Sequence, residues 1–285
     1  MPAGELLLLA LIALVSLVIS YIGAAVGLVL GQLRLILLVV WLGPLTGAAT
    51  SLAVSSVGAL FGALRHAREG RVRGRLLLTF GIPSALAAFA TASVAPRVDP
   101  RWLELAIASM LLLSGAVMEL RRRAERRAAA TEPADATATA ARGATDATDA
   151  TDATDDAAPE GPPPLRQVAL EMTVGGTLGA LSGVVGLLLG SLRLPVLLRL
   201  THAPKIAVGS NMAIGAITGS LAGIAAVREG TVDPLAFAVL APVTMIATHF
   251  GARTTGSLRR ETLIAWIAWV LIFSGLMMVA EIVAL

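Results

Sequence analysis

Long apolar runs dominate this sequence and decide the solvent in which it can fold. A helix needs about 20 apolar residues to cross roughly 30 Å of hydrocarbon, and runs of this length recur along the chain. Only 14% of the residues are charged and 56% are hydrophobic, against roughly 25% charged in an ordinary soluble domain. Because 285 residues cannot hide this much apolar surface in one soluble core, the sequence predicts a protein of the lipid bilayer.

The same composition excludes several kinds of chemistry. Without cysteine the chain has no disulfides, no thiol catalysis and no thiolate metal site, and three histidines leave little for another metal cage. No metalloprotease motif, phosphate-binding loop or intramembrane Ser-His pair occurs. The basic residues stand in short clusters between apolar runs, as in membrane loops. We therefore expect no enzymatic activity, cofactor, metal or nucleic-acid partner.

Residues 128–164 differ from everything around them. They hold a tandem Ala-Thr-Asp repeat and end in a proline-rich stretch. Such a segment has almost nothing to bury, so we predict a disordered linker. It separates a first transmembrane repeat, residues 1–127, from a second one, residues 165–285.

The two repeats resemble each other. Gly31 and Arg34 stand 159 positions before Gly190 and Arg193, within similar glycine- and leucine-rich segments. The same offset places residues 48–51 opposite 207–210, and an offset of 160 places residues 68–72 opposite 228–232. Matches in register over this length indicate an internal duplication.

Each repeat contains the same series of runs: a long one, a short one and three that can span. The long run is 5–30 or 167–190, and the short one is 33–44 or 192–201. Glycines join them, which predicts a broken, re-entrant helical hairpin. The spanning runs are 47–64, 76–95 and 102–120 in the first repeat, and 206–226, 235–252 and 263–284 in the second. We therefore expect an all-α polytopic membrane protein whose two repeats are inverted, because each crosses an odd number of times.

The loop charges agree with this topology. Fifteen arginines and lysines fall in loops on the linker side and three in loops on the other side. The positive-inside rule therefore places the linker in the cytoplasm and both termini outside the plasma membrane. These basic clusters are expected to set orientation and to contact lipid headgroups.

Two arginines lie outside the loops that set the orientation of the chain. Arg34 and Arg193 lie inside the apolar hairpins, three residues after Gly31 and Gly190. A charge at membrane depth costs at least about 2.5–3.5 kcal/mol. Helices restarting at these glycines would point free N–H groups into a shared gap, and guanidinium forks suit oxyanions such as sulfonate, sulfite, sulfate or carboxylate. The predicted anion site consists of the two arginines, the two glycines and six neutral residues: Gln32, Ser191, Thr50, Ser51, Ser210 and Asn211.

Structural roles for the same residues remain open. The arginines could snorkel to an interface or cap carbonyls at broken helix ends as structural cations. The glycines spaced four apart, among them Gly23, Gly27 and Gly31, are also typical of close helix packing.

The glycine-rich segments resemble the sulfite exporter TauE/SafE family. The family pattern G-x-x-G-x-G-G-G-x-x-x-x-P-x-L, followed by A-x-x-T-S, is similar to the second repeat through Gly183, Gly186, Gly190, Pro195 and Leu197 and through residues 203–210. The first repeat is similar through Gly27, Gly31, residues 43–45 and residues 48–51. The resemblance implies an inverted-repeat transporter for sulfite, organosulfonates or related anions. Here the triple glycine is reduced to its last member, an arginine replaces an apolar residue in each hairpin, and Ile36 stands in place of proline, which predicts a narrower and more charged site.

The leading hypothesis is a secondary transporter that exports a small anion by alternating access. An anion channel, or another membrane module without a transport cycle, is the alternative, and an enzyme acting on lipid is a third hypothesis that lacks a nucleophile, base or metal set. The sequence leaves open the anion, the direction, the coupling ion, the role of the linker and whether the chain forms a homo-oligomer.

Overall fold

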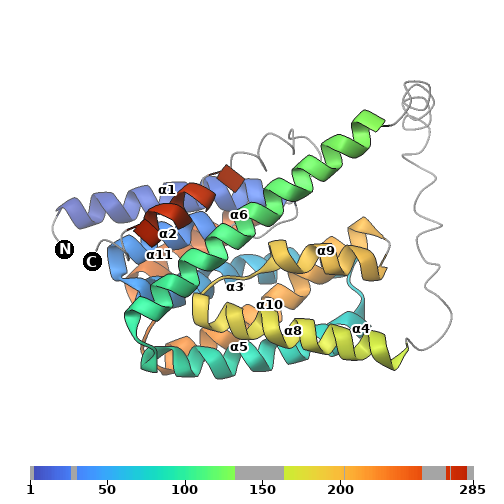
Figure 1. Ribbon diagram of the computed structural model, residues 1–285. Helices are drawn as coiled ribbons and strands as arrows, with labels where there is room; N and C mark the ends of the chain where they lie inside the picture. The colour runs from blue at the N-terminus through green and yellow to red at the C-terminus, as the bar shows by residue number, and fades with distance from the viewer. Residues whose placement is uncertain are drawn as a thin grey trace.

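The structure is a computed structural model that describes residues 3–26, 31–131, 164–201, 203–251, 268–269 and 271–280. This part of the chain forms a helical bundle without strands (Figure 1). Its main helices are α1 (Ala3–Val26), α2 (Gly31–Leu42), α3 (Pro44–Arg68), α4 (Gly74–Leu76), α5 (Ile82–Val94), α6 (Pro100–Thr131), α8 (Leu165–Val185), α9 (Gly190–Thr201), α10 (Pro204–Arg228) and α11 (Pro234–Gly251). Short π- and 3₁₀-helical segments, Leu77–Gly81 and Ala95–Arg97, flank α5.

The predicted all-α membrane class is confirmed. Within the described residues, seven helices are long and apolar enough to cross a membrane, and they include α1 and α8, the first arms of the predicted hairpins. The last predicted span, 263–284, is described only at 268–269 and 271–280, where it is helical. Helix α6 continues through residues 128–131, which were predicted as linker, because three consecutive alanines favour helix. The rest of that linker up to 163 lies outside the described residues.

The two repeats exchange packing partners. Helix α1 of the first repeat packs on α11 of the second, and α8 of the second repeat packs on α5 of the first. The largest contact joins α3 and α10, which are also the most buried of the candidate spans. Swapping the two repeats therefore turns these two contacts into each other, and it leaves the α3–α10 contact unchanged.

Helices α3 and α10 run antiparallel and approach closely through small residues. A Cβ at Gly219 would lie 2.8 Å from the Cβ of Ser56, and one at Gly223 would lie 3.6 Å from the Cα of Ala53. Contacts thus move backward along α10 as they move forward along α3. Without larger side chains between them, the two backbones pack at a short distance.

The hairpin α8–α9 leaves and returns at the same end of the bundle. Near the start of α8, Glu171 is paired with Arg75, and near the start of α10 the hydroxyl of Ser210 accepts a hydrogen bond from Arg73 N–H at 3.1 Å. Figure 1 shows α9 running back toward the end at which α8 begins. Because α9 has 12 residues and is therefore about 18 Å long, its first residue, Gly190, lies part of the way through the bundle.

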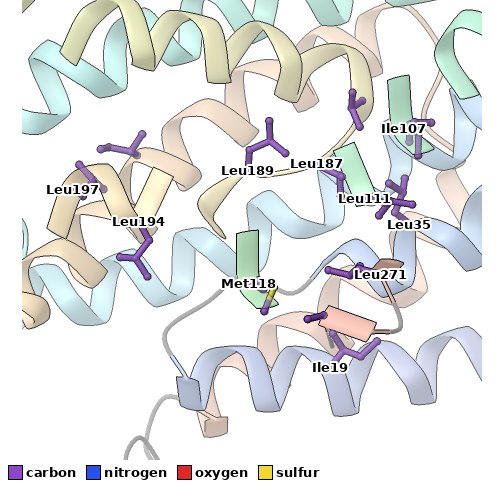
Figure 2. Packing of buried hydrophobic residues seen from close by; sticks show 14 of the residues in the cluster. Ile19, Leu35, Ile107, Leu111, Met118, Leu187, Leu189, Leu194, Leu197 and Leu271 are labelled. Carbon is purple, nitrogen blue, oxygen red and sulfur yellow. The ribbon is translucent and has the colours of Figure 1, made fainter. Parts of the chain in front are cut away.

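Apolar side chains hold the tip of this hairpin. Leu187 and Leu189, between α8 and α9, share one buried cluster with Leu35 of α2 and with Ile107 and Leu111 of α6. Figure 2 shows Leu187 close to Leu35 and Leu111. The non-helical backbone between the two arms is thereby shielded from lipid, as irregular backbone at membrane depth requires.

The helix bounds also correct the alignment of the repeats. Helices α3 and α10 both have 25 residues and begin at Pro44 and Pro204, an offset of 160. The extra residue of the second repeat therefore lies between α9 and α10. Thr50 and Ser51 correspond to Ser210 and Asn211, one position later than the sequence comparison places them.

The exchange of partners can be tested on two glycines of α8. A Cβ at Gly179 would collide with the backbone of Ser84 on α5, whereas a Cβ at Gly176 meets nothing within 4 Å. We expect Gly179→Ala to lower the unfolding free energy by about 1–3 kcal/mol through overpacking. Gly176→Ala, the matched control, is expected to keep or raise stability because alanine favours helix. Thermal unfolding of the purified variants measures both, and equal midpoints would contradict the α5–α8 packing.

Candidate functional site

The two glycine breaks meet inside the bundle. Helix α9 begins at Gly190, after the non-helical residues 187–189, where the sequence predicts a break. Helix α2 is described from Gly31, and residues 27–30 before it lie outside the described residues. The side-chain amide of Gln32 donates a hydrogen bond to Ser191 Oγ at 3.3 Å. These two residues are equivalent in the repeats, so the contact joins the two hairpins tip to tip.

The first turn of α9 is already partly capped. The carbonyl of Leu189 accepts hydrogen bonds from the N–H groups of Leu192 and Arg193, at 3.2 and 3.0 Å. The sequence predicts free N–H groups at the starts of these helices, but the N–H groups of Leu192 and Arg193 are bonded. At α9 the side chain of Arg193 is the stronger candidate donor.

Arg34 is buried and bonded within the protein. Its side chain is 2% exposed, and it donates to the hydroxyls of Ser55 and Thr244 at 2.5 and 3.1 Å and to the carbonyl of Ser51 at 3.1 Å. These acceptors belong to α3 and α11. Arg34 thus ties its hairpin to helices from both repeats.

Arg193 is buried without such bonds. Its side chain is 0% exposed, and its Nε and both Nη atoms have no hydrogen-bond partner in the described part of the chain. On α10 it approaches Gly215, where an added Cβ would lie 3.9 Å from Nη1. A buried guanidinium without acceptors is costly, and the N–H groups of this one are available to an added anion.

The remaining predicted residues divide into two groups. Ser51 and Asn211 brace the glycine breaks, because Ser51 Oγ donates to Gly31 O at 3.4 Å and Asn211 Nδ2 donates to Gly190 O at 3.3 Å. Thr50 and Ser210 instead hold loops of the opposite repeat. Thr50 Oγ1 accepts from Asp233 N–H at 2.9 Å, and Ser210 Oγ accepts from Arg73 N–H in the same way. The hydrogen bonds of Thr50 and Ser210 thus lead away from the two arginines.

These contacts distinguish the possible roles of the arginines. Snorkelling is contradicted for both, because neither side chain reaches the surface of the described bundle. A structural role fits Arg34, although its acceptors lie on α3 and α11 and not at the broken helix ends. Within the described residues Arg193 has no such structural bonds, so its surroundings favour a ligand.

Sequence reasoning missed two features. Thr244 bonds Arg34 from 210 positions away, and nothing in its sequence surroundings marks it. The burial of Glu171 is the second feature: its side chain, in the second turn of α8, is fully buried. Its carboxylate accepts hydrogen bonds from Arg75 at 2.7 and 3.2 Å, from Gln167 at 3.0 Å and from Thr79. The pairing with Arg75 joins residues 96 positions apart, so it depends on the packing of α8 beside α4 and α5.

Two cavities of about 530 and 750 Å³ lie elsewhere in the described structure. They are lined mainly by α1, α2, α6 and the helical residues 271–280. Neither is lined by an arginine. Both arginines are closed off in this conformation, and an anion would reach them only after the helices separate.

The comparisons with known proteins agree with the resemblance found in the sequence. The family model described as the sulfite exporter TauE/SafE matches residues 7–278. No curated protein and no solved structure matches the chain.

The different surroundings of the two arginines predict opposite effects of the same substitution. Arg34→Met should lower the unfolding free energy by about 2 kcal/mol or more, because hydroxyls bonded to a charged group lose their donor. Arg193→Met should raise it by about 1 kcal/mol or more, because an unpaired buried charge is removed. Thermal unfolding in buffer without small oxyanions measures both. A loss of stability in both variants would show that Arg193 has structural acceptors after all.

Proposed function

Because the chain belongs to the sulfite exporter TauE/SafE family, we propose that it exports a small anion, such as sulfite or an organosulfonate, by alternating access. The family is one of membrane transporters, and the described helices are those of a multi-pass membrane protein. The anion, its direction and the transport cycle are the proposal.

The buried, unbonded guanidinium of Arg193 is the observation that carries this proposal. Removing a lone charge from water costs several kcal/mol, even after relaxation. An oxyanion at the same place offsets that cost through charge-assisted hydrogen bonds, and a guanidinium fork holds two of its oxygens at once. The hairpin tips, with Gln32 and Ser191 in contact, complete the proposed binding region together with Arg34.

The arrangement of the repeats supports alternating access. We propose that the two repeats are inverted across the membrane, as the antiparallel course of α3 and α10 suggests. Each hairpin packs on helices of the other repeat, so a rocking motion that opens one end has an equivalent motion that opens the other. An anion channel would instead require a continuous path, whereas both arginines are enclosed here.

Export is the direction that needs no coupling ion. Moving one negative charge outward, from the negative interior to the positive exterior, gains about 2.3 kcal/mol per 100 mV. Import would require a cation to travel with the anion. Glu171, a fully buried carboxylate of the described bundle, is already paired with Arg75 and is poorly placed to bind one.

Flux through proteoliposomes tests the transport proposal. We expect sulfite to move toward the positive side, faster as the imposed potential increases. Arg34→Gln combined with Arg193→Gln should reduce this flux to that of empty liposomes, and Gly176→Ala serves as the control that keeps both arginines. Unchanged flux in the double variant would refute the site, and single-channel currents would favour a channel.

Two equivalent arginines test the inverted topology. Arg68 ends α3 and Arg228 ends α10, and both are exposed. Because the chain has no cysteine, Arg68→Cys and Arg228→Cys each introduce a single thiol. In intact cells, a membrane-impermeant maleimide should label position 228 and should reach position 68 only after the membrane is permeabilised. Labelling of both positions from the same side would contradict inversion.

A further inference from the structure

The duplicated hairpins carry the same arginine, but the two guanidiniums differ in their hydrogen bonds: Arg34 is bonded and Arg193 is not. We infer that the chain binds one small oxyanion, at Arg193, and that the residue at one equivalent position of the central helices decides which arginine is available. That position is Ser55 on α3 and Gly215 on α10. The inference rests on the proposed function, because it names the part of the same site that holds the anion.

The first acceptor of Arg34, the hydroxyl of Ser55, has no counterpart in the second repeat, where the equivalent residue is glycine. Helices α3 and α10 correspond at an offset of 160, so Gly215 stands where the first repeat has Ser55. Ser55 Oγ accepts a hydrogen bond from Arg34 Nη2 at 2.5 Å. Gly215 offers no side chain, although Arg193 Nη1 lies 3.9 Å from where its Cβ would be. The second repeat thus keeps the arginine and the approach of the helix but lacks the hydroxyl.

The counterpart of the second acceptor is bonded to a different donor. Thr244, which accepts from Arg34 Nη1, corresponds to Ser84 in the first repeat. Ser84 Oγ accepts a hydrogen bond from Thr218 Oγ1 at 3.0 Å. The residue equivalent to Thr218 is Gly58, which has no hydroxyl to compete for Thr244. The second repeat therefore lacks the hydroxyl of Ser55, and its counterpart of Thr244 bonds Thr218, while Arg193 has no side-chain partner in the described residues.

Apolar side chains lie beside Arg193 at Gly215. Leu188, from the hairpin tip, lies against the same stretch of α10, with a methyl 4.0 Å from the place of a Cβ at Gly215. Gly215 faces Ala59 of α3. Ser55, which bonds Arg34, lies four residues before Ala59, or roughly 6 Å along the helix axis. Arg34 adds positive potential there, and Arg193 supplies the hydrogen bonds.

The sharpest test adds a hydroxyl to position 215. Gly215→Ser restores the acceptor that Arg34 has, so Arg193 would be bonded internally and sulfite would have to displace that bond. In calorimetric titrations of the purified full-length protein with sulfite, we expect one site per chain in the parent. Gly215→Ser should weaken binding by about tenfold or more, the usual size of a hydrogen bond to a charged group.

Two controls separate the hydroxyl from the added bulk and from serine elsewhere on the helix. Gly215→Ala adds a Cβ that makes only ordinary contacts, the nearest at 3.9 Å, and should weaken binding much less than Gly215→Ser. Gly223→Ser adds a hydroxyl two turns away on α10, where the nearest atom would be 3.6 Å from its Cβ, and should bind as the parent does. Equal losses in the alanine and serine variants at position 215 would overturn the inference.

The arginines themselves give a second, independent test. Arg193→Lys keeps the charge and loses the planar fork, so we expect weak residual binding, whereas Arg193→Gln should bind no sulfite. Arg34→Gln should keep the single site with reduced affinity, because only the potential is lost. Should Arg34→Gln not fold, Ser55→Ala takes its place and should keep the site. Loss of binding in the Arg34 or Ser55 variant, with Arg193→Gln unaffected, would place the anion at the other arginine.

Flux measurements on the same variants distinguish this inference from the proposed function. Sulfite binding that depends on Arg193 without any flux would refute transport and leave the site intact. Flux that is unaffected by Gly215→Ser and Arg193→Gln would refute the site and leave transport intact. Absence of both sulfite binding and flux in the parent, with sulfate and thiosulfate giving the same result, would refute both.

Discussion

The close antiparallel approach of α3 and α10 is the contact on which the rest of the structure depends. Small residues such as Ser56 and Gly219 let the two backbones pack closely. Lipid gives no hydrophobic driving force between helices, so close van der Waals packing has to hold them together. Once the pair is formed, each hairpin has a helix of its own repeat beside it and a helix of the other repeat to pack on. The crossing therefore brings the two hairpin tips, and with them Gln32 and Ser191, into contact.

A duplicated backbone does not impose duplicated chemistry. Thr50 and Ser210 perform the same task in both repeats, since each accepts a hydrogen bond from a loop N–H of the other. Arg34 and Arg193 do not, because their neighbours on α3 and α10 differ by a serine and a glycine. Such an exchange leaves one arginine bonded within the protein and its equivalent without a hydrogen-bond partner in the described residues.

Much of this architecture could be predicted from the sequence, for identifiable reasons. The helix start at Gly190 follows from glycines that separate a long apolar run from a short one. The register of the repeats was misplaced by one residue at Thr50 and Ser51, because alanine-rich helices align almost equally well at either offset. The burial of Glu171 was not predicted, since its partner Arg75 lies on α4, 96 positions earlier in the chain.

The sequence by itself determined that the chain belongs in a membrane and that two arginines lie inside apolar runs, because the length of an apolar run and the charges within it can be read locally. It also predicted the duplication and the glycine-joined hairpins. Only the tertiary structure decided that the two arginines are unlike. Whether a guanidinium is bonded or free depends on Ser55, Thr244 and Gly215, and these residues reach it from other helices. Hydrogen bonds between side chains far apart in the chain have no local signature, so the packing of the helices had to be known first.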